Sequence, residues 1–312
     1  MRSISDMSRD PFPTEPRPGA DIGDRDSLTQ TSGLRNDLGE DGDRCEQGLP
    51  LTPISTARRP ESEDSPRAYD LRHRTYFLRD SELTTLAEIG TFRVVDASDL
   101  TEFSFAGDSP RMHREIRRLQ QHGLVEQKWF TGDRGERKRL LVLTKRGKNL
   151  ARKSGRVPEG QAIYHGLVKV REAKHDAALY RLYQKEAARI CGAGGKPLRV
   201  SLDYELKRIL HRDLAAYGEA GRKREVRERV AAKHGLPLVG DRVQIPDLRL
   251  EYENSDSERK RVDLELTTRN YHPGALAYKA KAGFSLYATR EDVSRLRRIL
   301  DEAELTARIF SL

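Results

Sequence analysis

The clearest hydrophobic pattern in this chain is an alternation of apolar and polar residues in two neighbouring segments, 245–252 and 262–267. A period of two is typical of strands that bury one face. The polar, charged residues 254–260 between the two segments suit a hairpin connection. The pattern therefore predicts two paired strands with one dry face and one acidic face.

The acidic face carries the candidate chemistry. Asp247 opens the first strand and Glu265 lies in the second, so strand pairing would bring their carboxylates close. Converging carboxylates repel each other, and either proton uptake or a hard cation such as Mg²⁺ relieves that repulsion. Lys279, in the helix expected after the second strand, is close enough in sequence to fold back over the pair and stabilise charge on a phosphate. The alternative is an ordinary solvated face of an antiparallel hairpin.

Upstream, the apolar spacing predicts three helices followed by two strands, at residues 80–90, 96–103, 108–122, 124–130 and 137–144. Asp108 and Pro110 open the third helix in the preferred order of cap and proline. Met112, Ile116 and Leu119 recur at helical spacing and form its buried stripe. The other faces of this helix and the following hairpin are basic, and the basic residues are Arg111, Arg114, Arg117, Arg118, Arg134, Arg137, Lys138 and Arg139.

This order of three helices and a two-stranded wing resembles the winged helix-turn-helix families. The resemblance implies that the third helix enters the major groove of duplex DNA and that the wing follows the adjacent backbone. The eight basic residues would then contact phosphates and guanine edges. Two alternatives remain open: the arginines form a solvated helix face, or the domain binds another protein.

Residues 173–190 have the spacing of a further helix, and Glu186 falls on its buried stripe. An acid among apolar neighbours requires a partner or a metal, or it curls out to solvent. Strand and helix patterns alternate from there to the C-terminus. We therefore expect an α/β domain with a mixed central sheet, so that the whole chain combines an α+β and an α/β part.

The pair Pro246-Asp247 with Glu265 on the next strand resembles the PD-(D/E)XK nuclease superfamily. Within it, the segments PDLRLEYE, VDLELTTRNYH and GFSLYA, with the lysine-bearing helix before the last, are similar to the replication-relaxation family of mobile-element proteins. The resemblance spans residues 69–312. It implies a winged helix at 69–156 and a nuclease-like domain at 157–312, after an N-terminal segment at 1–68.

The same resemblance assigns candidate roles. Asp247 and Glu265 would hold Mg²⁺, with Glu186 as a third ligand and Lys279 as the catalytic lysine. Thr267 stands where the superfamily has its lysine. Either Lys279 supplies that group from the helix, or the site is not catalytic. Arg249, Arg269 and Lys281 would hold the DNA backbone.

Charge separates the N-terminal segment from the remainder of the chain. The whole sequence of 312 residues has a net charge of +9, but residues 1–66 hold 8 arginines, no lysine and 14 acidic residues. With few apolar residues, this segment is expected to be a disordered acidic tail. The basic remainder favours polyanionic partners.

The remaining composition predicts a cytoplasmic protein. Cys45 and Cys191 are far apart and fit a reducing compartment, and no apolar run is long enough to span a membrane. The leading expectation is a duplex-DNA-binding protein of plasmid or mobile-element replication, relaxation or mobilisation, with a metal-dependent nuclease domain. The alternative is a non-enzymatic regulator or replication accessory whose second domain serves partner contacts, including homodimerisation.

Overall fold

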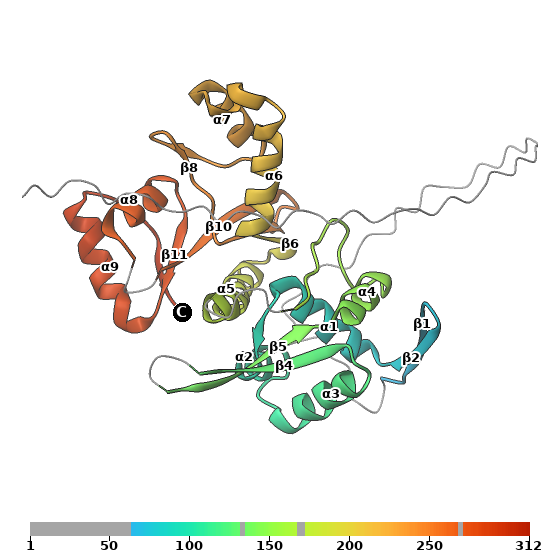
Figure 1. The fold of residues 1–312 in the computed structure, drawn as a ribbon. Helices are drawn as coiled ribbons and strands as arrows, with labels where there is room; N and C mark the ends of the chain where they lie inside the picture. The colour runs from blue at the N-terminus through green and yellow to red at the C-terminus, as the bar shows by residue number, and fades with distance from the viewer. Residues whose placement is uncertain (1–63, 132–134, 167–171, 268–270) are drawn as a thin grey trace, which may run out of the picture. The chain divides into compact units, whose positions relative to one another are not determined.

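The computed structural model describes residues 64–131, 135–166, 172–267 and 271–312. They belong to one compact unit, Glu46–Leu312. The described residues form a mixed α/β fold with a mixed sheet, as the sequence predicted (Figure 1). Most of the expected acidic tail, residues 1–63, lies outside the described residues, as do Arg134 and Arg269.

The folded part begins earlier than residue 69. Strands β1 (Arg67–Leu71) and β2 (Arg74–Leu78) form an antiparallel hairpin that the hydrophobic pattern did not reveal. Before it, the Asp64 carboxylate accepts hydrogen bonds from the amides of Asp80 and Ser81, both at 2.9 Å. These amides open helix α1 (Asp80–Phe92), so a distant aspartate satisfies the exposed N–H groups of the first turn.

The next elements follow the predicted order. Strand β3 (Val95–Asp96) leads into α2 (Ala97–Ser104) and α3 (Ser109–Gln121), and then β4 (Val125–Thr131), β5 (Arg137–Leu143) and α4 (Lys145–Lys153) follow. The three strands form an antiparallel sheet in the order β3-β5-β4. The Asp108 carboxylate caps α3, and Met112, Ile116 and Leu119 are buried as expected.

The larger sheet has the strand order β12-β11-β10-β9-β6. Strands β6 (Lys196–Leu202), β9 (Leu248–Glu253) and β10 (Arg259–Thr267) are antiparallel neighbours. Strands β11 (Ser285–Ala288) and β12 (Ile309–Ser311) continue the sheet in parallel with β10. The alternation read from the sequence therefore corresponds to β9 and β10, and Leu264 pairs with Leu248.

Helices cover this sheet on both faces. Helix α5 (Ala173–Gly192) packs on the face that carries Leu250, Leu264 and Tyr287. Helices α8 (Pro273–Lys281) and α9 (Arg290–Glu302) pack with Leu286 and Ala288 of β11, which point to the other face because side chains alternate along a strand. Helices α6 (Asp203–Ala215) and α7 (Arg224–Lys233), joined by a 3₁₀ turn, form a smaller cluster with Leu236.

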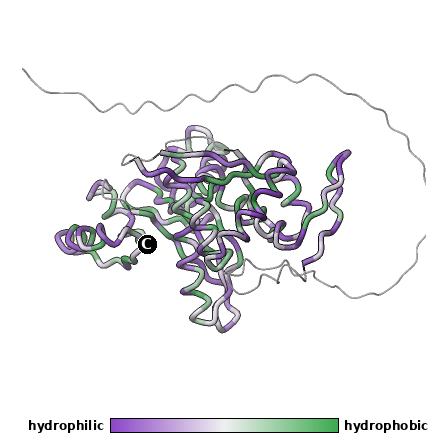
Figure 2. Tube along the Cα trace, turned by 90° about the horizontal axis from the view of Figure 1, so that it is seen from below, coloured by the Kyte–Doolittle hydropathy of each residue, from purple (hydrophilic) through white to green (hydrophobic). Residues whose placement is uncertain are grey.

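One hydrophobic core runs from α1 and α3 to α5 and the large sheet. At its centre Phe92 of α1 contacts the rings of Tyr180 and Tyr183 of α5, with centroids 5.2 and 4.9 Å apart. The side chain of Gln161 also binds both the N–H and the C=O of Val200, each at 2.9 Å. In Figure 2 hydrophobic stretches gather where strands and helices cross, and hydrophilic stretches dominate many of the outlying turns.

Candidate functional site

Asp247 and Glu265 lie together at one end of the large sheet. Asp247 directly precedes β9, and its amide lies 3.2 Å from Glu265 Oε2. One of its carboxylate oxygens, Oδ2, accepts a hydrogen bond of 2.8 Å from the amide of Leu266 on β10. The antiparallel register of β9 and β10 thus places both carboxylates at the same edge, because residue 248 pairs with residue 264.

Lysine 279 reaches this pair from helix α8. Its ammonium lies 2.9 Å from Glu265 Oε1 and 3.0 Å from Oε2, and it donates a 2.6 Å hydrogen bond to the carbonyl of Ile245. Tyr271 donates a further hydrogen bond of 2.6 Å to Glu265 Oε1. Both oxygens of Glu265 are therefore engaged by the chain's own groups.

The polar face of β9 and β10 is not ordinary solvated surface. Only 2 % of Glu265 and 1 % of Thr267 is exposed. Burial, and then repulsion from Asp247, raises the pKa of Glu265 to about 7, while Lys279 and Tyr271 act in the opposite direction. Thr267 donates to the carbonyl of Tyr287, at 3.0 Å.

Asp247 has a cationic neighbour of its own. His175 Nε2, from the first turn of α5, lies 3.4 Å from Asp247 Oδ2. Burial alone would lower the pKa of His175, but hydrogen bonds to Asp176 and Asp247 outweigh it and raise the pKa to about 10. His175 is therefore an imidazolium at neutral pH. The neighbouring Asp176 also pairs with Arg93, at 3.2 Å.

A pocket of about 510 Å³ lies beside His175. Arg93, which follows α1, also lines this pocket, together with Tyr204 and Lys207 of α6. The ring of Tyr204 lies under the Arg93 guanidinium, 5.1 Å from its centroid. None of Asp247, Glu265 and Lys279 lines this pocket, and His175 is the residue that both lines it and contacts Asp247.

Glu186 does not join the carboxylate pair. It is fully buried and accepts hydrogen bonds from Tyr287, at 2.5 Å, and from Arg189. Tyr287 pairs with Leu266 and Glu265 pairs with Leu286, so Tyr287 and Glu265 point to opposite faces of the sheet. The structure therefore places the predicted third metal ligand on the α5 face, away from the other two.

Arg249 is a structural residue and not a DNA contact. It is only 5 % exposed, and its guanidinium forms two hydrogen bonds with Asp263, of 2.7 and 2.8 Å. It also donates to the carbonyls of His234 and Gly235. Because these partners and its burial hold the Arg249 guanidinium inside the fold, it is not presented at the surface for the predicted contact with a DNA backbone.

The donor atoms at the pair match Mg²⁺ in kind. The carboxylates of Asp247 and Glu265 and the carbonyl of Ile245 supply oxygen, which Mg²⁺ prefers. Within the described ranges no group of three or more His, Cys, Asp or Glu residues converges as a metal site. Lys279 already binds two of these three groups as an internal cation. A metal ion at this position would have to displace its ammonium.

The predicted DNA-contacting residues of α3 divide into two groups. Arg114 and Arg117 are exposed, together with His113 one turn away. Arg118 instead turns toward α1, where its Nε lies 2.7 Å from the buried carboxylate of Glu82. The exposed basic face of α3 is therefore narrower than the sequence predicted, and Arg118 contributes to the packing of α1 against α3.

The β4–β5 hairpin presents an aromatic and basic surface. Trp129 is 59 % exposed, and the Arg137 guanidinium stacks on its ring, 4.8 Å from the centroid. Arg139 contacts His113 of α3, so the hairpin and the helix meet through these side chains. Lys138 lies 3.5 Å from Asp96 and is turned partly inward.

Comparison with known proteins gives no relative from which a function could be transferred. No family model matches the chain, and no curated protein and no solved structure matches it. No helix among the described residues is both long and apolar enough to cross a membrane.

Proposed function

We propose that this chain is a DNA-binding protein of a plasmid or other mobile element, and that residues 80–153 act as a winged helix on duplex DNA. The observation that carries the proposal is the exposed face of α3 with Arg114 and Arg117, next to the Trp129–Arg137 surface of the β4–β5 hairpin. Helices of this kind dock in the major groove while the wing follows the backbone. The expected compartment is the cytoplasm, and a homodimer remains a prediction.

Binding would divide between the two elements. Arginines on α3 form bidentate hydrogen bonds with guanine edges or phosphates, and those on the hairpin contact phosphates. The stacked Trp129 and Arg137 present a flat, positively charged surface that suits a sugar-phosphate backbone. This arrangement also accounts for the basic charge of the sequence after residue 66.

Two neighbouring arginines provide a sharp test by fluorescence anisotropy with a labelled duplex. Arg117→Gln removes an exposed cation and should weaken DNA binding about tenfold, as loss of a charged hydrogen bond does. Arg118→Gln removes the partner of Glu82 and should lower stability with a smaller effect on affinity. Equal affinities for wild type and Arg117→Gln would argue that α3 does not read DNA.

A second candidate function is metal-dependent cleavage of a phosphodiester at Asp247 and Glu265. It is favoured by the buried Glu265 next to the half-buried Asp247, with the ammonium of Lys279 in contact with Glu265. Mg²⁺, when bound, would supply Lewis-acid stabilisation of the phosphoryl oxygens and an activated water. Asp247, Glu265 and the Ile245 carbonyl are the groups that would hold it.

In phosphodiester cleavage at this site, the chain's residues would have separate roles. Lys279, released from Glu265, is positioned to donate to a phosphoryl oxygen and takes the place of the lysine absent at Thr267. His175 holds the carboxylate of Asp247, and Tyr271 holds that of Glu265. If the protein is instead a non-enzymatic regulator, Lys279 stays bound to Glu265 and His175 to Asp247, so that both carboxylates remain neutralised.

Cleavage of supercoiled plasmid with Mg²⁺ or Mn²⁺ separates the two functions. The nuclease function predicts nicking that disappears in Asp247→Asn and Glu265→Gln and survives in Asp256→Asn, an exposed carboxylate between β9 and β10. No nicking by the wild type, with unchanged DNA affinity in all variants, supports the regulator.

A further inference from the structure

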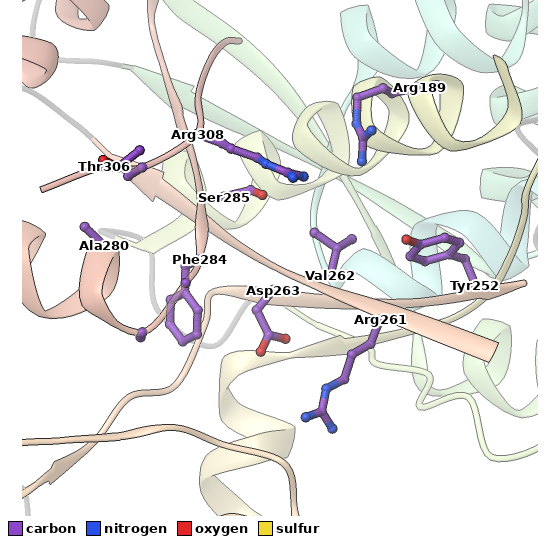
Figure 3. A pocket seen from close by; sticks show the side chains of 13 residues that line it. Arg189, Tyr252, Arg261, Val262, Asp263, Ala280, Phe284, Ser285, Thr306 and Arg308 are labelled. Carbon is purple, nitrogen blue, oxygen red and sulfur yellow. The ribbon is translucent and has the colours of Figure 1, made fainter. Parts of the chain in front are cut away.

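A second cavity, of about 570 Å³, lies over Val262 of β10 (Figure 3). It opens where the short strand β11 begins and is lined by residues of α5, β9, β10 and the segment leading into β12. None of Asp247, Glu265 and Lys279 lines it. The cavity is therefore separate from the carboxylate pair.

Four hydrogen-bond donors face this cavity. In Figure 3 the guanidinium groups of Arg189 and Arg308 point toward each other, and the hydroxyls of Ser285 and Tyr252 point into the same hollow. Ser285 is only 6 % exposed, yet its hydroxyl bonds to no described residue, and neither does that of Tyr252. The Ser285 hydroxyl, which lines the cavity, can therefore form a hydrogen bond with a ligand there.

Of the two arginines that face each other in the cavity, Arg189 is already paired with the buried carboxylate of Glu186, at 2.5 Å. Arg308 is exposed and forms no ion pair within the part of the chain that the structure describes. Glu186 is engaged by Arg189 and Tyr287. Asp263 lines the cavity from the other face of the sheet, where it is held by Arg249.

We propose that this cavity binds a phosphate group, held by the guanidinium groups of Arg189 and Arg308 and the hydroxyls of Ser285 and Tyr252. Planar guanidinium groups match phosphate oxygens in bidentate geometry, and the guanidinium of Arg308 has no carboxylate partner among the described residues. A volume of about 570 Å³ accommodates a phosphate together with an attached nucleoside. The phosphate belongs either to a free nucleotide or to a DNA strand, and the inference does not depend on the winged-helix proposal.

The first experiment measures the thermal midpoint of the full chain as a function of sodium phosphate, against sodium chloride at equal ionic strength. A bound ligand raises the midpoint in a concentration-dependent way, whereas the general salting effect of phosphate is shared by all variants. We expect Arg308→Gln to need about tenfold more phosphate than wild type for the same shift. Arg297→Gln, an exposed arginine of α9 outside the cavity, is the matched control and should respond as wild type.

Ser285→Ala and Tyr252→Phe test the same site if Arg308→Gln does not fold, because each removes one hydroxyl without changing the charge. A weaker phosphate response in these two variants and in Arg308→Gln supports the site. An unchanged response in all three variants overturns it, whatever the effect of Arg117→Gln on DNA affinity.

A second arm identifies the source of the phosphate by comparing duplexes with a 5′-phosphate and a 5′-hydroxyl. A preference for the 5′-phosphate that Arg308→Gln abolishes assigns a terminal phosphate. Equal affinity for both duplexes, weakened equally by Arg308→Gln, assigns a backbone phosphate. DNA affinity unaffected by Arg308→Gln, together with a lost response to free phosphate, assigns a free nucleotide or phosphate ligand.

Discussion

At the scale of single residues, the site combines contacts that a sequence reveals and contacts that it does not. Asp247 and Glu265 could be paired from the alternation in β9 and β10, because strand register follows that pattern. His175 and Tyr271 could not be assigned to the pair, since no local period links the start of α5 or the residues before α8 to β9. Glu186 was recognised as an acid on a buried stripe, but the sequence did not show that Arg189 and Tyr287 satisfy it.

The pH dependence of stability follows from two of these residues. The pKa of Glu265 rises from 4.5 to about 7 on folding, so its contribution to the free energy of unfolding is complete below pH 4.5 and is lost as the pH rises through 7. The pKa of His175 rises from 6.5 to about 10, so its contribution is lost between these values. Urea unfolding across this range measures how the free energy of unfolding depends on pH. Glu265→Gln should weaken that dependence between about pH 4.5 and 7, and His175→Gln should weaken it between about pH 6.5 and 10. Unchanged slopes in both variants would contradict the contacts described.

Replacing Lys279 should lower the stability of the fold, whereas replacing Lys281 on the same helix should not. Lys279→Met leaves Glu265 beside Asp247 without its cation, and breaking a buried pair in this way typically costs about 3–5 kcal/mol. Lys281→Met, two residues along α8 and exposed, should change the free energy of unfolding by less than about 0.5 kcal/mol. Chemical denaturation at pH 7.5 measures the free energy of unfolding of both variants. Equal losses in the two variants would show that the contacts of Lys279 contribute no net stability.

At the scale of elements, helices and strands with strong periodicity were predictable, and caps from distant residues were not. The residues between 108 and 123 carry the aspartate cap, the proline and the apolar stripe, and α3 forms there as predicted. The start of α1 depends on Asp64, sixteen residues before the first amide that it binds, and local cap rules do not reach that far along the chain. The β1–β2 hairpin was missed because its tip, Arg72 and His73, lacks the usual glycine signal.

The cap contributed by Asp64 is testable. Asp64→Ala leaves two amides of α1 without their acceptor and should lower the free energy of unfolding by about 1 kcal/mol, with a range of about 0.5–2. Ser65→Ala, at an exposed position next to it, is the control. Thermal or urea unfolding gives both values, and identical stabilities would mean that solvent replaces the cap.

At the scale of the whole molecule, the main hydrophobic core joins elements on both sides of the predicted boundary near residue 156. Apolar side chains show which positions are buried but not which partners they meet, so the contact of Phe92 with Tyr180 and Tyr183 could not be predicted. The Gly- and Pro-containing segment 155–160 is followed directly by Gln161, which binds Val200 of β6. The elements on either side of this segment are therefore joined by packing.

This shared core predicts a single cooperative unfolding transition for the described unit. Fluorescence of Trp129, the one tryptophan, reports on the β4–β5 hairpin, and far-ultraviolet circular dichroism reports on all helices. The two urea curves should coincide. Gln161→Ala leaves the Val200 backbone groups without partners and should shift both curves by about 1–3 kcal/mol. Separate midpoints for the two probes would show that the halves unfold independently.

The most direct test of the proposed function is the salt dependence of duplex DNA affinity for wild type and for Arg114→Gln/Arg117→Gln, measured by anisotropy from about 50 to 200 mM salt. Each phosphate neutralised contributes about −0.9 to the slope of log affinity against log salt concentration. If α3 and the β4–β5 hairpin dock on DNA, the wild-type slope is steep and the double variant is weaker, with a slope smaller in magnitude by up to about 2. A flat wild-type slope, or identical curves for the two proteins, would contradict DNA binding through this surface.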